Sequence, residues 1–453
     1  SEHLPEYMLP TYFVELGQLP LTSNGKLNRK ALPKPEVKAG EDYVAPSNRA
    51  ERKMVEIWSE VLKIAKEEIS VQANFFKLGG HSLKAMLVLS KIHKELNSRI
   101  SVSKFFQFPT IRAIVETIIS DNVYTFKSIE CAEKKEYYSL SSVQERMYVI
   151  QQNNPLGRTY NVYSQIKLRA DVTFKEVSNV LMIISERNDI LRTIISYVKN
   201  IPVQIVLDKI DLDIEFVKNE SQNRISEKLT KPFNLNIAPL SRFIFAELTN
   251  EKVLFVNMHH IITDAHSLQL FMKEFEELLY SNESKPVKFQ YKDFSNWQKR
   301  NARKEIIENQ RKYWLNIFND KIPILKLPND EILQLSNDHA MEYFDINSKL
   351  TNSLYNLISK ENITLFTLIL SIFKILLAKL SNSSDIIVGT PLAGRIHNDL
   401  QSVLGCFINT IVLRSSPKEE KSFIQYLREL NVICTKAYDN QEYQYENLVD
   451  DIA

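Results

Sequence analysis

Two polar breaks, the first rich in proline and the second in charged residues, limit what this chain can fold into, because they separate a short segment from a much longer one. Residues 32–48 (LPKPEVKAGEDYVAPSN) contain three prolines and mixed charge, and residues 120–137 are similarly polar. Such stretches bury too little apolar surface to fold alone. We therefore expect a small unit of about 75 residues between the breaks and a large α/β unit, or two lobes, from residue 138 onward.

The charge balance argues against partners that need a strong electrostatic field. The 453 residues include 57 Lys and Arg against 55 Asp and Glu. A nearly neutral chain does not attract nucleic acid or an anionic membrane, so neither is an expected partner. The three cysteines, Cys131, Cys406 and Cys434, are odd in number and lack the spacing of metal ligands. This cysteine usage favours a reducing, cytoplasmic location.

One apolar stretch resembles a membrane span in composition. Residues 363–380 (ITLFTLILSIFKILLAKL) are strongly apolar, but Lys374 interrupts them after eleven residues. Eleven residues are too few to cross about 30 Å of hydrocarbon, so we expect a buried helix. The N-terminal sequence SEHLPEYMLP also lacks the basic start and apolar stretch of a signal peptide.

The small segment has the apolar spacing of a helical bundle, with predicted helices at residues 48–64, 82–96 and 110–119. The second of these follows the sequence FFKLGGHSLKA, in which Gly79 and Gly80 permit a tight turn. Ser82 then starts the helix, where unpaired N–H groups and the helix dipole favour a negatively charged group such as a phosphate ester. A serine at this position is also an ordinary helix N-cap, so the physical argument alone leaves both roles open.

FFKLGGHSLKA resembles the signature of peptidyl carrier proteins, the small four-helix domains of nonribosomal peptide synthetases. The resemblance implies that a phosphopantetheinyl transferase attaches 4′-phosphopantetheine to Ser82. It further implies that the terminal thiol of this arm holds an aminoacyl or peptidyl group as a thioester.

The N-terminal segment has a second, shorter resemblance. An Asn-Gly pair, typical of a tight hairpin turn, comes directly before Lys26, which by itself suits a solvated surface turn. Together with LPEYMLP at residues 4–10, the segment resembles the last motif of adenylation domains. The resemblance implies that Lys26 contacts the substrate carboxylate and ATP. Because the nucleotide-binding body is not in the sequence, an upstream adenylation body is an expected partner.

The segment MHHIITDAHS, residues 258–267, contains the second group of chemically capable side chains. His259 and His260 close a predicted strand, in which successive side chains point to opposite faces, so at most one is catalytic. Histidine, with an ordinary pKa of about 6.5, suits proton transfer at neutral pH. Asp264 is expected to hold the loop through an arginine. There are two alternatives. One is a metal site that includes His266, and the other is that both adjacent histidines are buried structural residues. No metal is expected, because no further ligand pair is recognisable in the sequence.

MHHIITDAHS resembles the HHxxxDG motif of condensation domains, two-lobed relatives of chloramphenicol acetyltransferase. Five further segments match this family in order, at residues 141–151, 186–193, 291–297, 404–414 and 440–449. The resemblance implies that His260 lies beside the reacting amine and thioester, either as a general base or as a group that orients the nucleophile.

The same resemblance makes Asp264 a structural anion paired with an arginine. Arg192 is the first candidate for this partner, with Arg187 and Arg395 behind it. Three departures from the family pattern stand out: Ala265 replaces the glycine after Asp264, Asn188-Asp189 replaces His-Glu, and Gln444 stands where proline is common.

Two other functions remain open from the sequence. Epimerisation domains share the paired histidines, although SSVQERMYVI at residues 141–150 favours condensation. A catalytically inert carrier or docking fragment is the second alternative.

The expected organisation is an adenylation-domain remnant (1–35), a linker (36–46), a carrier domain (47–120), a second linker (121–137) and a C-terminally incomplete condensation domain (138–453). The expected fold is a four-helix carrier bundle followed by a two-lobed α/β domain. The expected reaction joins the acyl group on the carrier to the amine of an aminoacyl thioester on the downstream carrier domain.

Overall fold

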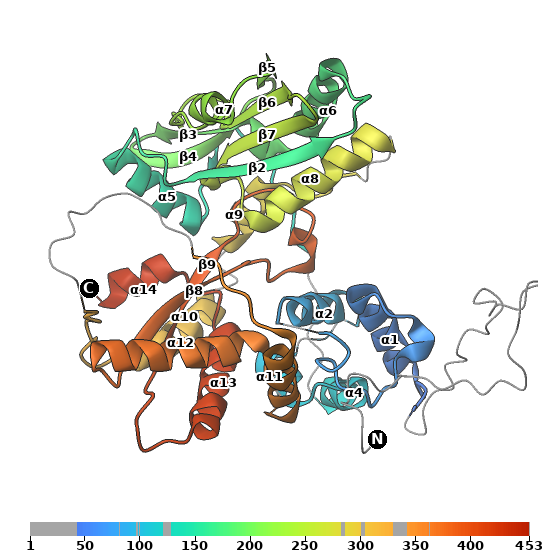
Figure 1. The fold of residues 1–453 in the computed structure, drawn as a ribbon, viewed down its shortest axis with the longest axis vertical. Coiled ribbons are helices and arrows are strands. Elements are labelled where there is room, and N and C mark those ends of the chain that lie inside the picture. The colour runs from blue at the N-terminus through green and yellow to red at the C-terminus, as the bar shows by residue number, and fades with distance from the viewer. Residues whose placement is uncertain are drawn as a thin grey trace, which may run out of the picture.

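The structure is a computed structural model that describes residues 43–80, 82–96, 98, 100–120, 128–281, 286–299, 304–328, 342–361 and 363–452. Lys26 and the rest of the adenylation-like segment lie outside the described residues. Figure 1 shows three parts: a small helical part near the N-terminus, a lobe built on strands β2–β7, and a second lobe around β8 and β9.

The helical part contains α1 (Arg49–Leu62), η3 (Lys66–Glu68), α2 (Ser82–Glu95), α3 (Val102–Gln107) and α4 (Ile111–Ser120). Asn48 caps α1 by accepting a hydrogen bond from Glu51 N at 2.8 Å. The core centres on Trp58, which is fully buried and packs edge-to-face against Phe75 with ring centroids 5.0 Å apart. The three predicted helices are confirmed, whereas α3 escaped prediction because six residues hold no full amphipathic repeat.

The first lobe is built on a four-stranded sheet in the order β2 (Asn161–Leu168), β7 (Lys252–His259), β6 (Ser241–Glu247), β5 (Asp213–Lys218). β5 and β6 are parallel, and the other neighbours are antiparallel. Alternate residues of β6 serve the two faces: Phe243 and Phe245 belong to the large core with α6 (Phe174–Arg187) and α8 (Ala265–Tyr280), while Ile244 packs with α7 (Gln222–Leu229). Helices therefore cover both faces, as Figure 1 shows.

A smaller sheet completes the first lobe, in the order β1 (Tyr138–Ser139), β4 (Ile201–Val206), β3 (Thr193–Val198). Beside it lie α5 (Ser142–Asn153), η4 (Asp189–Arg192) and α9 (Tyr291–Gln298). A capping box starts α5: Ser141 Oγ accepts from Gln144 N, and Gln144 Oε1 accepts from Ser141 N.

The second lobe is built on the antiparallel pair β8 (Ile386–Leu392) and β9 (Asn409–Ser415). Its helices are α10 (Lys304–Ile317), α11 (Ser348–Glu361), α12 (Leu365–Ser381), α13 (Phe423–Asp439) and α14 (Tyr445–Ile452), with the short η7 (Asn398–Leu400) between the strands. Apolar residues of this lobe and of the helical part form one continuous cluster. The two-lobed α/β fold and the preceding helical bundle agree with the expected architecture.

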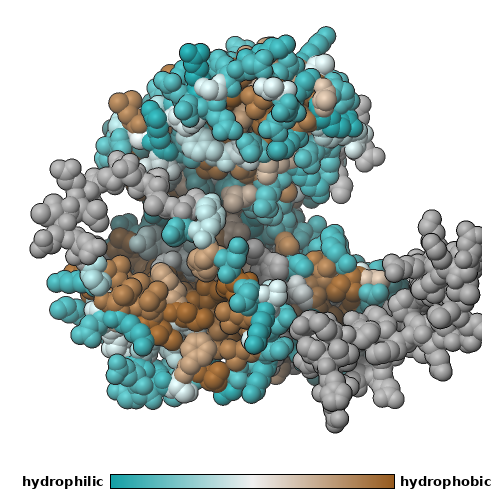
Figure 2. Space-filling view, in the orientation of Figure 1, coloured by the Kyte–Doolittle hydropathy of each residue, from teal (hydrophilic) through white to brown (hydrophobic). Residues whose placement is uncertain are grey.

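Helix α12 corrects one expectation. Its Lys374 side chain is 0% exposed and donates to Leu413 O at 2.7 Å, and burial lowers the pKa of Lys374 to about 8. The opposite face carries an apolar stripe that is 41–50% exposed, made of Leu365, Ile369, Ile372, Phe373, Leu376 and Leu380. Figure 2 shows brown surface in this region. The helix is thus buried on one face only, and no helix among the described residues has the length and apolarity needed to cross a membrane.

Candidate active site and carrier attachment site

The end of β7 separates the two adjacent histidines. His259 is the last residue of the strand and pairs with Asn161 of β2, whereas His260 begins the 3₁₀ helix η5 (His260–Ile262). The backbone N–H of His260 donates to Tyr160 O at 2.7 Å. The His259 side chain is buried, and His260 is half-buried.

His259 has the surroundings of a structural residue. Its Nδ1 accepts from Ile261 N at 3.1 Å, its Nε2 lies 3.5 Å from Gln151 Oε1, and the rings of Tyr160 and Phe233 flank it. Burial, with a smaller contribution from His260, lowers the pKa of His259 to about 3. The ring is therefore neutral at physiological pH and both of its nitrogens face protein groups.

His260 leaves one ring nitrogen available for a ligand. Its Nδ1 lies 3.7 Å from Cys406 Sγ, which comes from the loop before β9 of the second lobe. Within the described ranges of the chain, Nε2 has no hydrogen-bond partner. Of the two histidines, His260 is thus the one that can meet a reacting group.

Asp264 ties the histidine loop to the second lobe. It caps α8 by accepting from Ser267 N at 2.7 Å, and its other oxygen accepts from Phe407 N at 2.9 Å. Arg395 Nη2 lies 3.4 Å from Asp264 Oδ1, and both side chains are 2% exposed. The carboxyl group is therefore buried, and it links residues from both lobes.

The first choice for the arginine partner of Asp264 was wrong. Arg192 instead pairs with Asp189 at 2.7 Å, and Arg187 pairs with Glu274 at 2.8 Å. Arg395, the third candidate, occupies the position because the loop after β8 folds over α8. Arg192 lies in η4, directly before β3, and is engaged there by a neighbour three residues away.

Arg395 also organises the loop before β9. Its Nη1 donates to Val403 O at 2.7 Å and to Leu400 O, and its Nη2 donates to Ser267 Oγ at 2.6 Å. The guanidinium carbon stands 4.0 Å from the centroid of the Phe407 ring. One side chain thus contacts the middle of this loop, the Phe407 ring near its end, and the first turn of α8.

The departures from the family pattern are accommodated locally. Ala265 is the first residue of α8 and is not among the residues with positive φ, so its methyl group causes no backbone strain. Asn188 is buried and its side chain donates to Ile184 O at 3.0 Å and to Glu274 Oε2 at 3.2 Å. Gln444 caps the turn before α14 by donating to Glu442 O at 3.0 Å.

Three site residues were not singled out from the sequence: Ser267, Tyr291 and Cys406. Ser267 Oγ donates to Gly405 O at 2.6 Å and accepts from Gly405 N at 3.0 Å. Tyr291 is 1% exposed and its hydroxyl donates to Cys406 O. At Gly405, with φ of +151°, a Cβ would stand 1.9 Å from the Tyr291 ring, so the loop requires glycine there. The sequence segments that contain these residues match the family pattern, but no pattern of consecutive residues indicates that the three side chains contact one another.

The glycine turn before α2 has the geometry that the attachment motif needs. Gly79 has φ of +86°, and a Cβ on Gly80 would lie 2.3 Å from the Phe75 ring. Glycine at both positions lets the chain turn closely against this ring, and α2 then starts at Ser82. The residues present therefore fit a phosphate ester at the N-terminus of a helix.

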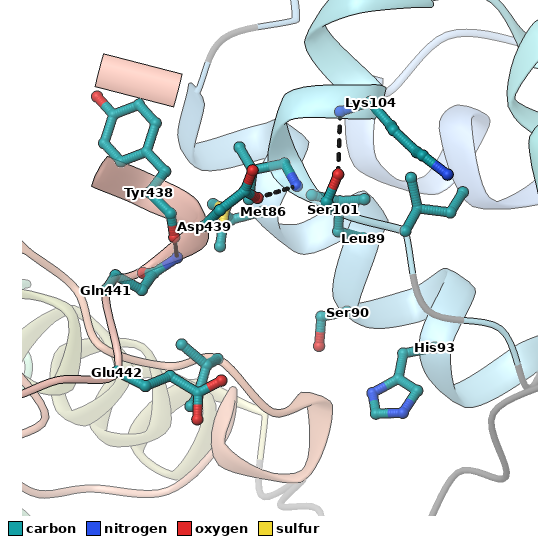
Figure 3. A pocket seen from close by; sticks show the side chains of 13 residues that line it. Met86, Leu89, Ser90, His93, Ser101, Lys104, Tyr438, Asp439, Gln441 and Glu442 are labelled. Atoms are coloured by element: carbon teal, nitrogen blue, oxygen red, sulfur yellow. Dashed lines mark hydrogen bonds between the residues drawn. The ribbon is translucent and has the colours of Figure 1, made fainter. Parts of the chain in front are cut away.

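The helical part contacts the second lobe beside this turn. Val102 N of α3 donates to Asp439 Oδ1 at 2.6 Å, next to the Ser101 cap of the same helix. Figure 3 shows side chains on the two sides of a cavity of about 380 Å³: Met86, Leu89, Ser90 and His93 from α2, opposite Tyr438, Asp439, Gln441 and Glu442. The two parts thus meet through α2, α3 and the end of α13.

Two further cavities lie along the same contact. One of about 390 Å³ extends from Met86 and Phe106 of the helical part to His266 and Arg395. Another, of about 420 Å³, lies between Gly79–Gly80 and the junction of α11 and α12. Mostly apolar space therefore joins the surface of the helical part to the Asp264–Arg395 network.

The described residues hold no group of three or more His, Cys, Asp or Glu side chains arranged to bind a metal ion. Because His266 Nε2 lies 3.3 Å from Gln401 O, its ring faces a backbone carbonyl.

Comparisons with known proteins distinguish the helical part from the rest of the chain. The family model described as phosphopantetheine attachment site matches residues 52–118, and that of the condensation domain matches residues 134–453. Over its whole length the chain is 38% identical to bacitracin synthase 3 of Bacillus licheniformis, of which it spans 7%. It is also 37% identical to tyrocidine synthase 2 of Brevibacillus parabrevis, spanning 13% of that protein and 99% of this chain.

Solved structures share the fold. A four-domain nonribosomal peptide synthetase bound to AMP and glycine superposes on 71% of this chain and 25% of its own, with a TM-score of 0.61 and 22% identity. The chain therefore belongs to the condensation-domain family, in a segment of a nonribosomal peptide synthetase where a phosphopantetheine-carrying domain precedes the condensation domain.

Proposed function

We propose that the chain forms a peptide bond between two carrier-bound substrates, with His260 at the reacting centre and Ser82 as the attachment point of the donor. The supporting observation is the cavity of about 390 Å³ that extends from carrier residues Met86 and Phe106 to His266 and Arg395. These two residues belong to the network that holds the His260 loop. The proposed domain limits are 47–120 for the carrier and 138–453 for condensation.

The residues of the chain have separable roles in this reaction. Phosphopantetheine on Ser82 supplies a flexible thiol that carries the acyl group. His260 orients the attacking amine or the thioester through its free Nε2, and Asp264 and Arg395 hold the loop that bears it. The new C–N bond replaces the C–S bond, and one amine proton ends on the released carrier thiol, so the step needs no redox partner.

The reaction requires partners outside this chain. We propose a phosphopantetheinyl transferase that modifies Ser82, an adenylation body upstream that loads the carrier, and a downstream carrier that presents the acceptor amine. Lys26 would belong to that adenylation body. The proposed location is the cytoplasm, where all three cysteines stay reduced. Epimerisation is not favoured, because the condensation family model covers residues 134–453.

Two measurements test the proposal separately. Intact mass spectrometry after incubation with coenzyme A and a phosphopantetheinyl transferase should show one added phosphopantetheine on the wild type and none on Ser82→Ala. Addition of the same mass to Ser82→Ala would remove the assigned attachment site.

The second measurement follows amide formation between the loaded chain and an aminoacyl-loaded downstream carrier. His260→Ala should load normally, which serves as its folding control, but should form product about a hundredfold more slowly. Equal rates for the wild type and His260→Ala would reject His260 as a reacting residue.

A further inference from the structure

Cys406 touches the proposed catalytic histidine from the opposite lobe. Its side chain is 0% exposed, and its Sγ lies 3.7 Å from His260 Nδ1. This separation is within hydrogen-bond range for sulfur, which is larger than oxygen or nitrogen. The contact is made to the ring nitrogen that points into the protein, and Nε2 is left for the substrates.

The thiol is protonated at neutral pH. Burial, reinforced by the negative charge of Asp264, raises the pKa of Cys406 well above its ordinary value. A protonated thiol has an S–H to donate, and the ring nitrogen 3.7 Å away is a good acceptor in a neutral imidazole whose proton is on the other nitrogen.

The position of the sulfur is fixed by contacts on both sides of it. Tyr291 donates its hydroxyl hydrogen to Cys406 O, Gly405 N donates to Ser267 Oγ at 3.0 Å, and Phe407 N donates to Asp264 Oδ2 at 2.9 Å. All three partners belong to the first lobe, as does His260. The thiol is therefore held against the imidazole although the two residues are 146 positions apart.

We propose that Cys406 is a positioning residue: its S–H donates to His260 Nδ1 and holds the neutral imidazole in the tautomer that carries its proton on Nε2. This inference rests on the proposed function of His260. It deepens that function, because an Nε2–H group donates a hydrogen bond to the thioester carbonyl oxygen and does not accept the amine proton. His260 then stabilises the negative oxygen that forms when the amine adds to the carbonyl carbon.

The tautomer can be read without any reaction. Nitrogen-15 NMR of the histidine-labelled full chain, with the His260 signals identified by their loss in His260→Gln, distinguishes a protonated from an unprotonated ring nitrogen. The wild type should show a protonated Nε2 and a hydrogen-bonded, unprotonated Nδ1. A proton on Nδ1 of the wild-type chain at neutral pH would overturn the inference without any substitution at Cys406.

Variants at the sulfur provide the second arm. Cys406→Ala should move the Nδ1 signal toward that of an imidazole nitrogen without a hydrogen bond and lower kcat about threefold to tenfold with little change in KM. Cys406→Ser, which keeps a donor, should retain the wild-type tautomer and recover most of kcat. Cys434→Ala removes an equally buried cysteine of α13 that lies outside the site, and it should change neither quantity.

The outcomes separate the two proposals. An unchanged Nδ1 signal in Cys406→Ala rejects the role of Cys406, whatever the activity. Equal amide formation by the wild type and His260→Ala rejects the proposed function, while the NMR signals still report on the thiol contact.

Discussion

Replacing Arg395 with alanine should destabilise the protein far more than the same change at Arg187 or Arg192, although each of the three arginines forms an ion pair. The pair of Arg395 with Asp264 is the most enclosed, with both side chains 2% exposed. For Arg192 and Asp189 the exposed fractions are 12% and 17%, and for Arg187 and Glu274 they are 24% and 17%.

The expected magnitude follows from what Arg395→Ala leaves behind. Asp264 keeps two backbone donors, from Ser267 and Phe407, but loses its only cationic partner among the described residues. Removing one member of a buried ion pair costs about 3–5 kcal/mol. Loss of a more exposed pair costs about 1 kcal/mol or less. Because the guanidinium also bonds Val403 O and Leu400 O, the upper half of the first range is expected.

Thermal unfolding of the three alanine variants provides the comparison. With roughly 2–4 °C lost per kcal/mol, Arg395→Ala should lower Tm by about 8–20 °C, and Arg187→Ala by about 4 °C or less. In a double-mutant cycle, Asp264→Asn should cost less in the Arg395→Ala background than in the wild type. Equal Tm values for Arg395→Ala and Arg187→Ala would refute the argument that burial sets the cost.

Three further predictions concern other parts of the molecule. Gly80→Ala should destabilise the carrier domain by about 1–3 kcal/mol, because its Cβ would stand 2.3 Å from the Phe75 ring. If the carrier domain of this variant unfolded at the same temperature as that of the wild type, the close approach would be contradicted. Lys374 has a pKa lowered to about 8 in the folded state, against an ordinary value of 10.5, so the unfolded chain binds more protons between these values and stability should rise with pH across about 8 to 10.5. Lys374→Met should abolish that rise in the free energy of unfolding, measured with urea. If the variant and the wild type showed the same dependence of this free energy on pH, the amine would not be desolvated in the folded state. Asp439→Ala should speed hydrogen exchange at the Val102 amide about tenfold to a hundredfold, whereas Asp439→Asn, which keeps an oxygen acceptor, should change it less; equal exchange in all three proteins would argue against the contact between carrier and second lobe.

Local patterns predicted the elements that carry the site. The apolar spacing of residues 48–64, 82–96 and 110–119 corresponds to α1, α2 and α4, and the β-branched residues before His259 correspond to β7. Each of these patterns lies within a run of consecutive residues, so it predicts the element without knowledge of any tertiary contact. The short α3 has no such repeat, and its N-terminus is completed by Asp439, from a distant part of the chain.

The apolar residues 363–380 show what consecutive residues alone cannot predict. It correctly indicated a helix and a non-spanning segment, but it could not indicate that one face of α12 would stay exposed. Which face of an apolar helix is covered depends on the neighbours that the fold brings to it. Lys374, the one charged residue in the middle of this stretch, lies on the covered face, where it donates a hydrogen bond to the carbonyl of Leu413.

By itself, the amino-acid sequence determined the helix that starts at Ser82, the glycine turn before it, and the adjacency of His259 and His260 at the end of a strand. Only the tertiary structure decided that Arg395 and not Arg192 pairs with Asp264, and that Cys406 lies against His260. The physical reason is distance along the chain: these partners are 131 and 146 positions apart, so their meeting depends on how two lobes pack and not on any repeat within a segment.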